Sequence, residues 1–265
     1  MRVLVELRAK ASCVYDLMYH HKLQGFLYDL LRGSAYGDLH DRRGYKFFCF
    51  SNIFPSVDMQ AGDVRRFLVS SPDEGFIGVV AGGLERLRLG KERVNIGEMS
   101  FSVEGISVLE PKIDGACVLA AGTPIVVRIP KASYARYGIE PPEDYEYVYW
   151  RKQYRLEAFV QQIEDSLFKK YSQFYSTRME AFPILEHLTF QKQVCSHLVL
   201  PSNPEIKIFG SIWRFGFCNV NEEKRNILQF ALETGIGELN SMGYGFMNLV
   251  QFGKNEAVNK RDLNA

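Results

Sequence analysis

A glycine-rich segment near the C-terminus constrains the fold more than any other part of the chain. It reads Gly235-Ile236-Gly237-Glu238-Leu239-Asn240-Ser241-Met242-Gly243-Tyr244-Gly245, with four glycines in eleven residues. Glycines at this density let the backbone adopt positive φ and come close to a neighbouring group. The segment follows a predicted helix, Asn221 to Glu233, and precedes a predicted strand, Tyr244 to Phe252. Because successive N–H groups in such a turn form a nest for an anion, we expect a cradle for a nucleic-acid phosphate.

Two nucleotide-binding motifs fit this segment badly. A Walker loop needs Gly-Lys-Ser/Thr, which is absent, and a dinucleotide fingerprint follows a strand and opens a helix, the reverse of the order here. A purely structural role is the alternative, since Gly235 fits a helix C′ cap. That role leaves the other glycines and the Asn-Ser pair unexplained. The candidate RNA-binding residues of the segment are Gly235, Gly237, Asn240, Ser241, Gly243 and Gly245.

The segment resembles the C-terminal glycine-rich loop of the CRISPR-associated repeat-RNA endoribonucleases, the "Cas six" type of the RAMP superfamily. Members of that family resemble this chain in length as well. The loop by itself identifies only the superfamily. The resemblance implies two tandem ferredoxin-like (RRM-like) domains, binding of a precursor CRISPR repeat RNA and endonucleolytic cleavage of that RNA.

Composition sets broad limits. The chain has 265 residues, 46% of them hydrophobic and 24% charged, which are ordinary values for a globular protein of one or two domains. With a net charge of only +1, any RNA site must be a local patch. Five scattered cysteines without a Cys-x-x-Cys pair exclude a zinc ribbon or a dense disulfide framework. With no signal peptide or membrane-spanning run in the sequence, we expect a cytoplasmic protein with no membrane partner.

The first half of the chain predicts the order β-α-β-β-α-β. Met1 to Ala9 alternates between apolar and polar residues, as a half-buried strand does. Ser71-Pro72-Asp73-Glu74 is a helix start, with Ser71 as the expected N-cap, and the glycines of that helix allow close packing on a sheet. The remaining predicted elements are a helix over 19–31, a central strand over 46–54, a strand over 65–70 and one or two strands over 93–109.

The second half predicts the same order after a linker at residues 111–122. Its predicted elements are a strand over 124–129, an aromatic excursion over 134–150, a helix over 151–174, strands over 190–200 and 206–217, and the helix, loop and strand at the C-terminus. The chain is therefore expected to be an α+β protein of two tandem ferredoxin-like domains. We expect residues 1–115 to carry the catalytic residues and residues 116–265 the glycine-rich loop.

Cleavage of RNA by its own 2′-hydroxyl needs a base, an acid and a group that stabilises the crowded phosphorane. Histidine is the natural proton shuttle because its unperturbed pKa is about 6.5. The sequence offers five histidines: His20, His21, His40, His187 and His197. His40 precedes a basic pair, Arg42 and Arg43, and then Lys46. We expect both arginines to bind phosphate, although a plain charged surface remains the alternative.

The segments 23–28, 39–40 and 45–48 resemble the first-domain active site of the same family. The resemblance implies that Tyr28, His40 and Lys46 are the catalytic residues. The pair His20-His21 is a departure that offers a second histidine. From the residues alone, Tyr28 also fits an interfacial aromatic residue and Lys46 a solvated charge at a strand edge.

No carboxylate and histidine residues occur at metal-ligand spacing, so the sequence predicts metal-independent chemistry without a cofactor. The expected products are a 2′,3′-cyclic phosphate or 3′-phosphate and a 5′-hydroxyl. Besides repeat RNA, the partners considered are subunits of a CRISPR effector complex and a second copy of the chain. Two alternatives remain: a catalytically silent RNA-binding subunit of such a complex, and an RNA-binding module outside CRISPR systems that stacks bases on sheet-face aromatics.

Overall fold

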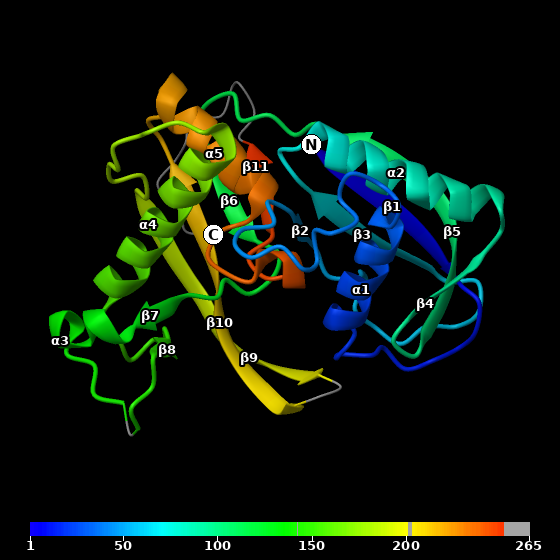
Figure 1. Ribbon diagram of the computed structural model, residues 1–265, viewed down its shortest axis with the longest axis horizontal. Coiled ribbons are helices and arrows are strands. Elements are labelled where there is room, and N and C mark those ends of the chain that lie inside the picture. Colours follow the sequence, from blue (N-terminus) through cyan, green and yellow to red (C-terminus); the bar gives the residue numbers. More distant parts are fainter. Residues whose placement is uncertain (142, 201–202, 252–265) are drawn as a thin grey trace. The chain divides into compact units, whose positions relative to one another are not determined.

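The computed structural model describes residues 1–141, 143–200 and 203–251 (Figure 1). Its contacts divide the chain into two compact units. The first unit contains Met1–Pro111 and also Asn240–Gly243. The second unit contains Lys112–Leu239 and the chain from Tyr244 onward. Four residues of the glycine-rich segment thus belong to the first unit, although they lie far from it in sequence.

The first unit is a ferredoxin-like fold with one additional strand. Its elements are β1 (Arg2–Ala9), α1 (His20–Leu31), β2 (Cys49–Phe50), β3 (Val64–Ser70), α2 (Glu74–Leu89), β4 (Arg93–Ile96) and β5 (Met99–Leu109). The antiparallel sheet has the order β2-β3-β1-β5-β4, and Figure 1 shows α1 and α2 on one face of it. Apart from the β4 edge strand, which forms a hairpin with β5, the predicted β-α-β-β-α-β order is confirmed.

The alternation in β1 determines which face of the sheet is buried. The predicted inward residues Val3, Val5, Leu7 and Ala9 are at most 2% exposed and pack with the apolar stripe of α1. The N-cap of α2 differs from the prediction, because Asp73 rather than Ser71 accepts the hydrogen bond from the Phe76 N–H at 3.0 Å. The Ser71 hydroxyl instead donates to the Phe47 carbonyl at 2.8 Å.

The glycines of α2 do not pack on the sheet as predicted. A Cβ atom at Gly83 would lie 3.2 Å from Leu30 Cδ2, so this glycine permits close approach of α1. A Cβ atom at Gly78 or Gly82 would meet nothing within 4 Å. Of these three glycines only Gly83 is required for packing, and it serves a helix–helix contact. The fourth glycine of α2, Gly75, would place a Cβ atom 2.6 Å from the Tyr36 hydroxyl.

The predicted central strand over residues 46–54 is wrong in length and position. Only Cys49–Phe50 form a strand, and β2 is at the edge of the sheet. The positive φ of Phe47, 52°, interrupts the extended backbone before it. The burial was predicted correctly, since Phe50 is fully buried. An edge strand is buried here because the 3-10 turn η2 (Asn240–Met242) and Gly243 cover it within the same unit.

The second unit repeats the fold with a different insertion. Its elements are β6 (Cys117–Ala121), β7 (Arg128–Pro130), η1 (Lys131–Ser133), α3 (Tyr134–Tyr137), β8 (Tyr147–Tyr149), α4 (Leu156–Tyr175), β9 (His187–Leu200), β10 (Asn203–Phe217), α5 (Glu222–Thr234) and β11 (Met247–Gln251). The sheet order β11-β6-β10-β9 is again antiparallel and ferredoxin-like. The two-stranded pair β7–β8 is inserted between β6 and α4.

The predicted linker over residues 111–122 is wrong for residues 117–121. These residues form β6, which lies inside the sheet with Val118 and Leu119 fully buried. The predicted first strand over 124–129 is correct only for residues 128 and 129, which belong to β7; before them, Ile125 forms an isolated bridge with Ser211. Glycines on both sides made a short buried strand resemble a linker.

The helices of the second unit follow their predicted patterns with one exception. Asn221 accepts a hydrogen bond from the Lys224 N–H at 2.9 Å, which confirms it as the N-cap of α5. The apolar stripe of α5 is buried as predicted. The helix predicted over 151–174 instead spans Leu156–Tyr175, and Leu156, its first residue, is 44% exposed. The predicted end of the last strand at Phe252 lies outside the described residues.

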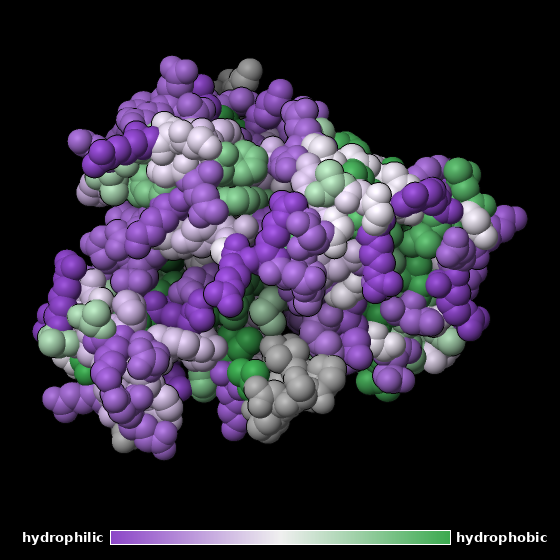
Figure 2. Space-filling model, viewed as in Figure 1, coloured by the Kyte–Doolittle hydropathy of each residue, from purple (hydrophilic) through white to green (hydrophobic). Residues whose placement is uncertain are grey.

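No helix among the described residues is long and apolar enough to cross a membrane. On the face shown in Figure 2, hydrophilic residues cover most of the surface, and hydrophobic residues form separate patches. This face therefore has no single extended apolar area of the kind that marks a large interaction surface.

Candidate active site

The base of the glycine-rich loop is fixed inside the second unit. The buried Lys170 of α4, 2% exposed, donates from Nζ to the Gly235 carbonyl at 2.9 Å and to the Gly237 carbonyl at 3.2 Å. A Cβ atom at Gly237 would lie 2.5 Å from the Val126 carbonyl oxygen, so only glycine fits there. All four glycines of the segment have positive φ, from 68° to 86°. Conformation and close packing therefore account for these glycines without a ligand.

The amide groups of the loop are largely used by the protein itself. The N–H groups of Ile236, Glu238 and Gly245 donate to main-chain carbonyls at 2.9 Å. The Gly243 N–H donates to the Asn240 carbonyl, also at 2.9 Å. An open nest of the kind expected from the sequence would need these donors free. Any contact of this loop with RNA is thus more readily made by side chains such as that of Ser241.

The tip of the loop, residues 240–243, lies against α1 and β2 in the first unit. A Cβ atom at Gly243 would be 2.5 Å from Phe50 Cε2 and 3.1 Å from His20 Cδ2. The Ser241 side chain is hydrogen-bonded to Tyr28. The tip therefore contacts one candidate catalytic residue and one of the two helix histidines, which sequence spacing alone does not reveal.

The structure brings Tyr28 and His40 together. Their ring centroids are 4.9 Å apart, with the planes nearly perpendicular at 89°. Burial raises the pKa of Tyr28, while hydrogen bonding with Ser241 and Gln24 acts in the opposite direction. The phenol consequently stays protonated at neutral pH and can donate a hydrogen bond.

His40 lies in an exposed loop that Lys46 holds closed. The His40 side chain is 67% exposed, and its Nδ1 is 2.9 Å from Asp41 Oδ1. Lys46 Nζ donates to the Leu39 carbonyl at 2.6 Å, to the His40 carbonyl at 3.2 Å and also to the Arg42 carbonyl. Burial lowers the pKa of Lys46. In this arrangement Lys46 positions the backbone of His40, and its ammonium group is directed at carbonyls.

The two arginines predicted to bind phosphate are in different environments. Arg42 forms a two-point ion pair with Asp38, at 3.1 Å from Nε and 2.7 Å from Nη2. Arg43 is exposed and has neither a hydrogen bond nor an ion pair within the part of the chain that the structure describes. Arg43 is therefore the better placed of the two to bind a phosphate from solvent.

His20 is the second histidine close to the loop tip. Its Nε2 is 3.0 Å from Asn52 Oδ1, and its ring stacks on Tyr19 with centroids 4.5 Å apart. The Tyr19 hydroxyl also donates to Asn52 Oδ1, at 3.4 Å, so this atom is an acceptor and His20 Nε2 carries the proton. Burial lowers the pKa of His20, which favours the neutral imidazole. The sequence analysis did not identify Asn52 as a partner of His20. The sequence signal that could have pointed to it is the polar pair Ser51-Asn52 inside an apolar run.

One group of potential metal ligands is assembled by the fold. The ligand atoms of Glu186, His187 and Cys218 lie within 4.8 Å of one another in the second unit. Sequence spacing did not indicate this group, because Cys218 comes from the end of a different strand. Lys224 Nζ is bonded to Glu186 Oε1, and the Cys218 N–H donates to Oε2 at 2.7 Å. With its carboxylate already paired to an ammonium, this group is a poor fit for a divalent cation.

The chain is an α+β protein of two ferredoxin-like units, and its glycine-rich loop contributes residues to both. Comparison with known proteins identifies its family. Residues 108–249 match the family model described as CRISPR associated protein Cas6, C-terminal. The chain is 33% identical to a CRISPR-associated endoribonuclease Cas6 of Haloferax mediterranei over 261 residues, covering 95% of this chain and 94% of the relative. It is 29% identical to CRISPR-associated endoribonuclease Cas6 2 of Methanocaldococcus jannaschii, covering 95% and 100%.

A solved structure described as a RAMP protein binding different RNA substrates has the same fold, with a TM-score of 0.69 at 20% identity and coverage of 95% of this chain and 100% of that chain. The chain belongs to the Cas6 family. The resemblance predicted from its two motif regions is confirmed.

Proposed function

We propose that this protein is an endoribonuclease that binds the repeats of a CRISPR precursor transcript in the cytoplasm and cleaves each repeat once. Membership of the Cas6 family supports the activity, because the relatives are named as endoribonucleases. The contact of 4.9 Å between the Tyr28 and His40 rings is the observation that carries the proposal for this chain. Two residues twelve positions apart form a proton-transfer pair beside the loop tip.

In the proposed reaction the 2′-hydroxyl of the RNA attacks the adjacent phosphorus. His40 removes the proton from the 2′-oxygen as the new O–P bond forms. The bond from phosphorus to the 5′-oxygen breaks, and a proton must reach that oxygen; the protonated Tyr28 hydroxyl beside His40 is the donor that we assign. The products are a 2′,3′-cyclic phosphate and a 5′-hydroxyl.

The roles of the cations are assigned from their partners. Lys46 holds the His40 loop through carbonyl contacts and acts as a positioning residue. Arg43 binds a phosphate next to the scissile bond. The Ser241 side chain keeps Tyr28 oriented through its hydrogen bond. Asn240 completes the polar surface of the loop tip.

We further propose that the reaction needs no metal ion, because proton transfer by Tyr28 and His40 supplies the acid and base that the chemistry requires. End-labelled repeat RNA from the protein's own CRISPR locus provides the test. We expect one cut per repeat, a 2′,3′-cyclic phosphate end, and the same rate with excess EDTA. Loss of cleavage in EDTA with rescue by Mg²⁺ or Mn²⁺ would rule out this mechanism.

A catalytically silent RNA-binding subunit of a CRISPR effector complex is the second candidate. The neutralised cations favour it, since Lys46 is bonded to carbonyls and Arg42 to Asp38. The same assay separates the two proposals. Tight binding of repeat RNA with intact strands after long incubation would establish the silent subunit.

A further inference from the structure

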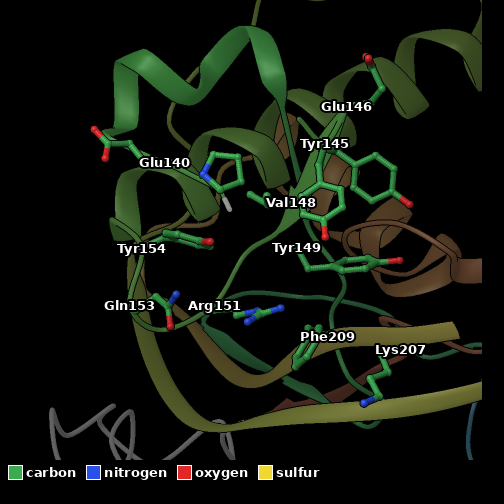
Figure 3. A pocket seen from close by; sticks show the side chains of 12 residues that line it. Glu140, Tyr145, Glu146, Val148, Tyr149, Arg151, Gln153, Tyr154, Lys207 and Phe209 are labelled. Carbon is green, nitrogen blue, oxygen red and sulfur yellow. The ribbon is translucent and has the colours of Figure 1, made fainter. Parts of the chain in front are cut away.

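The second unit contains a pocket that takes no part in the proposed cleavage chemistry. It has a volume of about 560 Å³ and opens beside the β7–β8 insertion, with strand β10 forming its other wall (Figure 3). Its aromatic and cationic lining residues are Tyr145, Tyr147, Tyr149, Arg151, Tyr154, Lys207 and Phe209. The volume is within the range of about 300–1,000 Å³ that is typical of small-ligand sites.

Flat groups face this pocket from two elements. The Arg151 guanidinium carbon lies 3.9 Å from the centroid of the Phe209 ring, and the Tyr149 ring is 6.3 Å from the same ring. Tyr145 and Tyr147 are 44% and 40% exposed, although large apolar or aromatic rings are usually covered. Aromatic rings and guanidinium planes are the groups on which proteins stack unpaired RNA bases.

The charges in the pocket suit a nucleotide better than a peptide. Arg151 and Lys207 place two cations in the lining of the pocket, where a phosphate of a bound nucleotide would be attracted. The carboxylates of Glu140 and Glu146 point away from Arg151 in Figure 3. A pocket for a proline-rich or apolar peptide needs the aromatic rings but has no use for two converging cations.

The wall of the pocket is tied to the glycine-rich loop. The Arg128 guanidinium carbon lies 4.9 Å from the centroid of the Tyr147 ring. The Arg128 main-chain N–H donates to Glu238 Oε1 at 2.9 Å, and its side chain forms an ion pair with Glu238 Oε2. Glu238 belongs to the loop that reaches Tyr28 with its tip. A strand of RNA held in this pocket is therefore held next to the base of that loop.

We propose that this pocket binds one unpaired nucleotide of the repeat RNA, with its base stacked on the Tyr149 ring and the Arg151 guanidinium, which Phe209 supports from its other face, and its phosphate near Lys207. The proposal rests on the proposed function, because the ligand is taken to be repeat RNA. It is separate from the cleavage chemistry, since the pocket contains neither Tyr28 nor His40.

The test uses a repeat RNA that carries a 2′-deoxynucleotide at the cut site, so that it binds without being cleaved. 2-Aminopurine replaces each unpaired base in turn, because its fluorescence is quenched by stacking. With the wild-type chain we expect quenching at one position. Tyr149→Leu and Phe209→Leu should abolish this quenching and weaken RNA binding roughly 10-fold, within the range of about 1–3 kcal/mol for one base–aromatic stack. Tyr149→Phe keeps the ring and should behave as wild type.

The control variant is Tyr175→Leu, which removes a tyrosine of the same unit that is 49% exposed and outside the pocket. It should change neither the quenching nor the affinity. A measurement on the wild-type chain guards against variants that fail to fold: 5-iodouridine at the quenched position should photo-crosslink to a pocket residue, identified by mass spectrometry.

Quenching that persists in both leucine variants, or crosslinks that all map outside the pocket, would overturn the proposal. RNA binding without quenching at any unpaired position would also overturn the proposal. A peptide would then be the next ligand to test for this pocket. If the wild-type chain does not bind repeat RNA at all, the proposed function fails and takes this proposal with it. If it binds with quenching at one position but does not cleave the unmodified RNA, the pocket assignment stands and only the catalytic proposal fails.

Discussion

The two units share one strand order and differ in what has been added to it. The first unit extends its sheet with the edge strand β4 and carries Tyr28 and His40 on α1 and the loop that follows. The second unit inserts the β7–β8 pair before α4 and carries the aromatic pocket. In our proposals, the same scaffold carries the proton-transfer groups in one copy and the stacking groups in the other. The comparison teaches that the two copies differ in their insertions and loops while both sheets keep their topology, so a division of function between them has to come from those insertions and loops.

The sharpest way to test this division is His40→Ala. Loss of the proposed general base should lower single-turnover cleavage by about 10²-fold or more. RNA affinity should change little, because phosphate contacts dominate such interfaces. Quenched-flow cleavage and filter binding measure the two effects. His187→Ala, which removes an exposed histidine of the second unit, is the matched control and should cleave normally.

Further substitutions locate the shuttle if His40 is not essential. Tyr28→Phe removes the proposed general acid and should slow cleavage by about 10²-fold. Lys46→Ala should slow it by only about 10-fold, because it loosens the His40 loop and leaves both proton-transfer groups in place. Normal cleavage by His40→Ala together with slow cleavage by His20→Ala or His21→Ala would move the shuttle onto α1. If none of the three histidines matters, the silent subunit becomes the better explanation.

The next largest effect is expected at the loop tip. Gly243→Ala places a Cβ atom 2.5 Å from the fully buried Phe50 ring at a φ of +86°. We expect the free energy of unfolding to fall by about 2 kcal/mol, and cleavage to fall with it because Ser241 is displaced from Tyr28. Urea denaturation measures the first effect. Gly78→Ala is the control, because its site is open and helical, and a gain of about 0.5–1 kcal/mol is expected. Equal stability of Gly243→Ala and wild type would show that the tip is not docked on β2.

The base of the loop should respond more weakly. Lys170→Met removes an ammonium group that donates to the carbonyls of Gly235 and Gly237. Two buried carbonyls lose their donor, but the desolvated charge is also removed, so we expect a loss of about 1 kcal/mol in the free energy of unfolding. Lys169→Met on the exposed face of α4 should have no measurable effect. A stability loss in Lys169→Met equal to that in Lys170→Met would contradict this role for Lys170.

The smallest effect is a pH dependence confined to the first unit. Burial lowers the pKa of both His20 and His21 in the folded state, so the unfolded chain binds more protons near their ordinary pKa of about 6.5. The stabilisation is therefore present above that pH and is lost as the pH falls toward the folded-state pKa values. Urea denaturation at pH 7.5 and pH 5 should show a loss below about 1 kcal/mol from these two groups. The double variant His20→Asn/His21→Asn should lose less than wild type over the same interval.

The sequence predicted correctly those features that depend on residues within a single helix or strand. The alternation of β1 and the Asn221 cap of α5 were both confirmed, because each depends on residues within one element. The strand β6 was missed since its five residues lie between glycines and carry no alternation. Short buried strands and linkers have similar composition, and only pairing distinguishes them.

The candidate site shows the same limit. The proximity of Tyr28 and His40 was predicted only through a family resemblance, because no periodicity relates a helix residue to a loop residue. The carbonyl contacts of Lys46, the ion pair of Arg42 and the position of Asn52 depend on backbone geometry that side-chain patterns do not encode. The expected phosphate nest stays a prediction: packing explains Gly237 and Gly243, and internal hydrogen bonds use the N–H groups of Ile236, Glu238, Gly243 and Gly245.

The cover over β2 has a consequence for the order of events during synthesis. The first unit is completed only by residues 240–243, so a ribosome must add residues 112–239 before that cover exists. At roughly 5–20 residues per second, this delay is on the order of ten seconds. Throughout that time the emerging chain presents an unprotected sheet edge with Phe50, the kind of surface that pairs with other chains. Premature termination after the first unit should therefore yield aggregates, and the nascent chain is a natural client for chaperones that bind apolar strands.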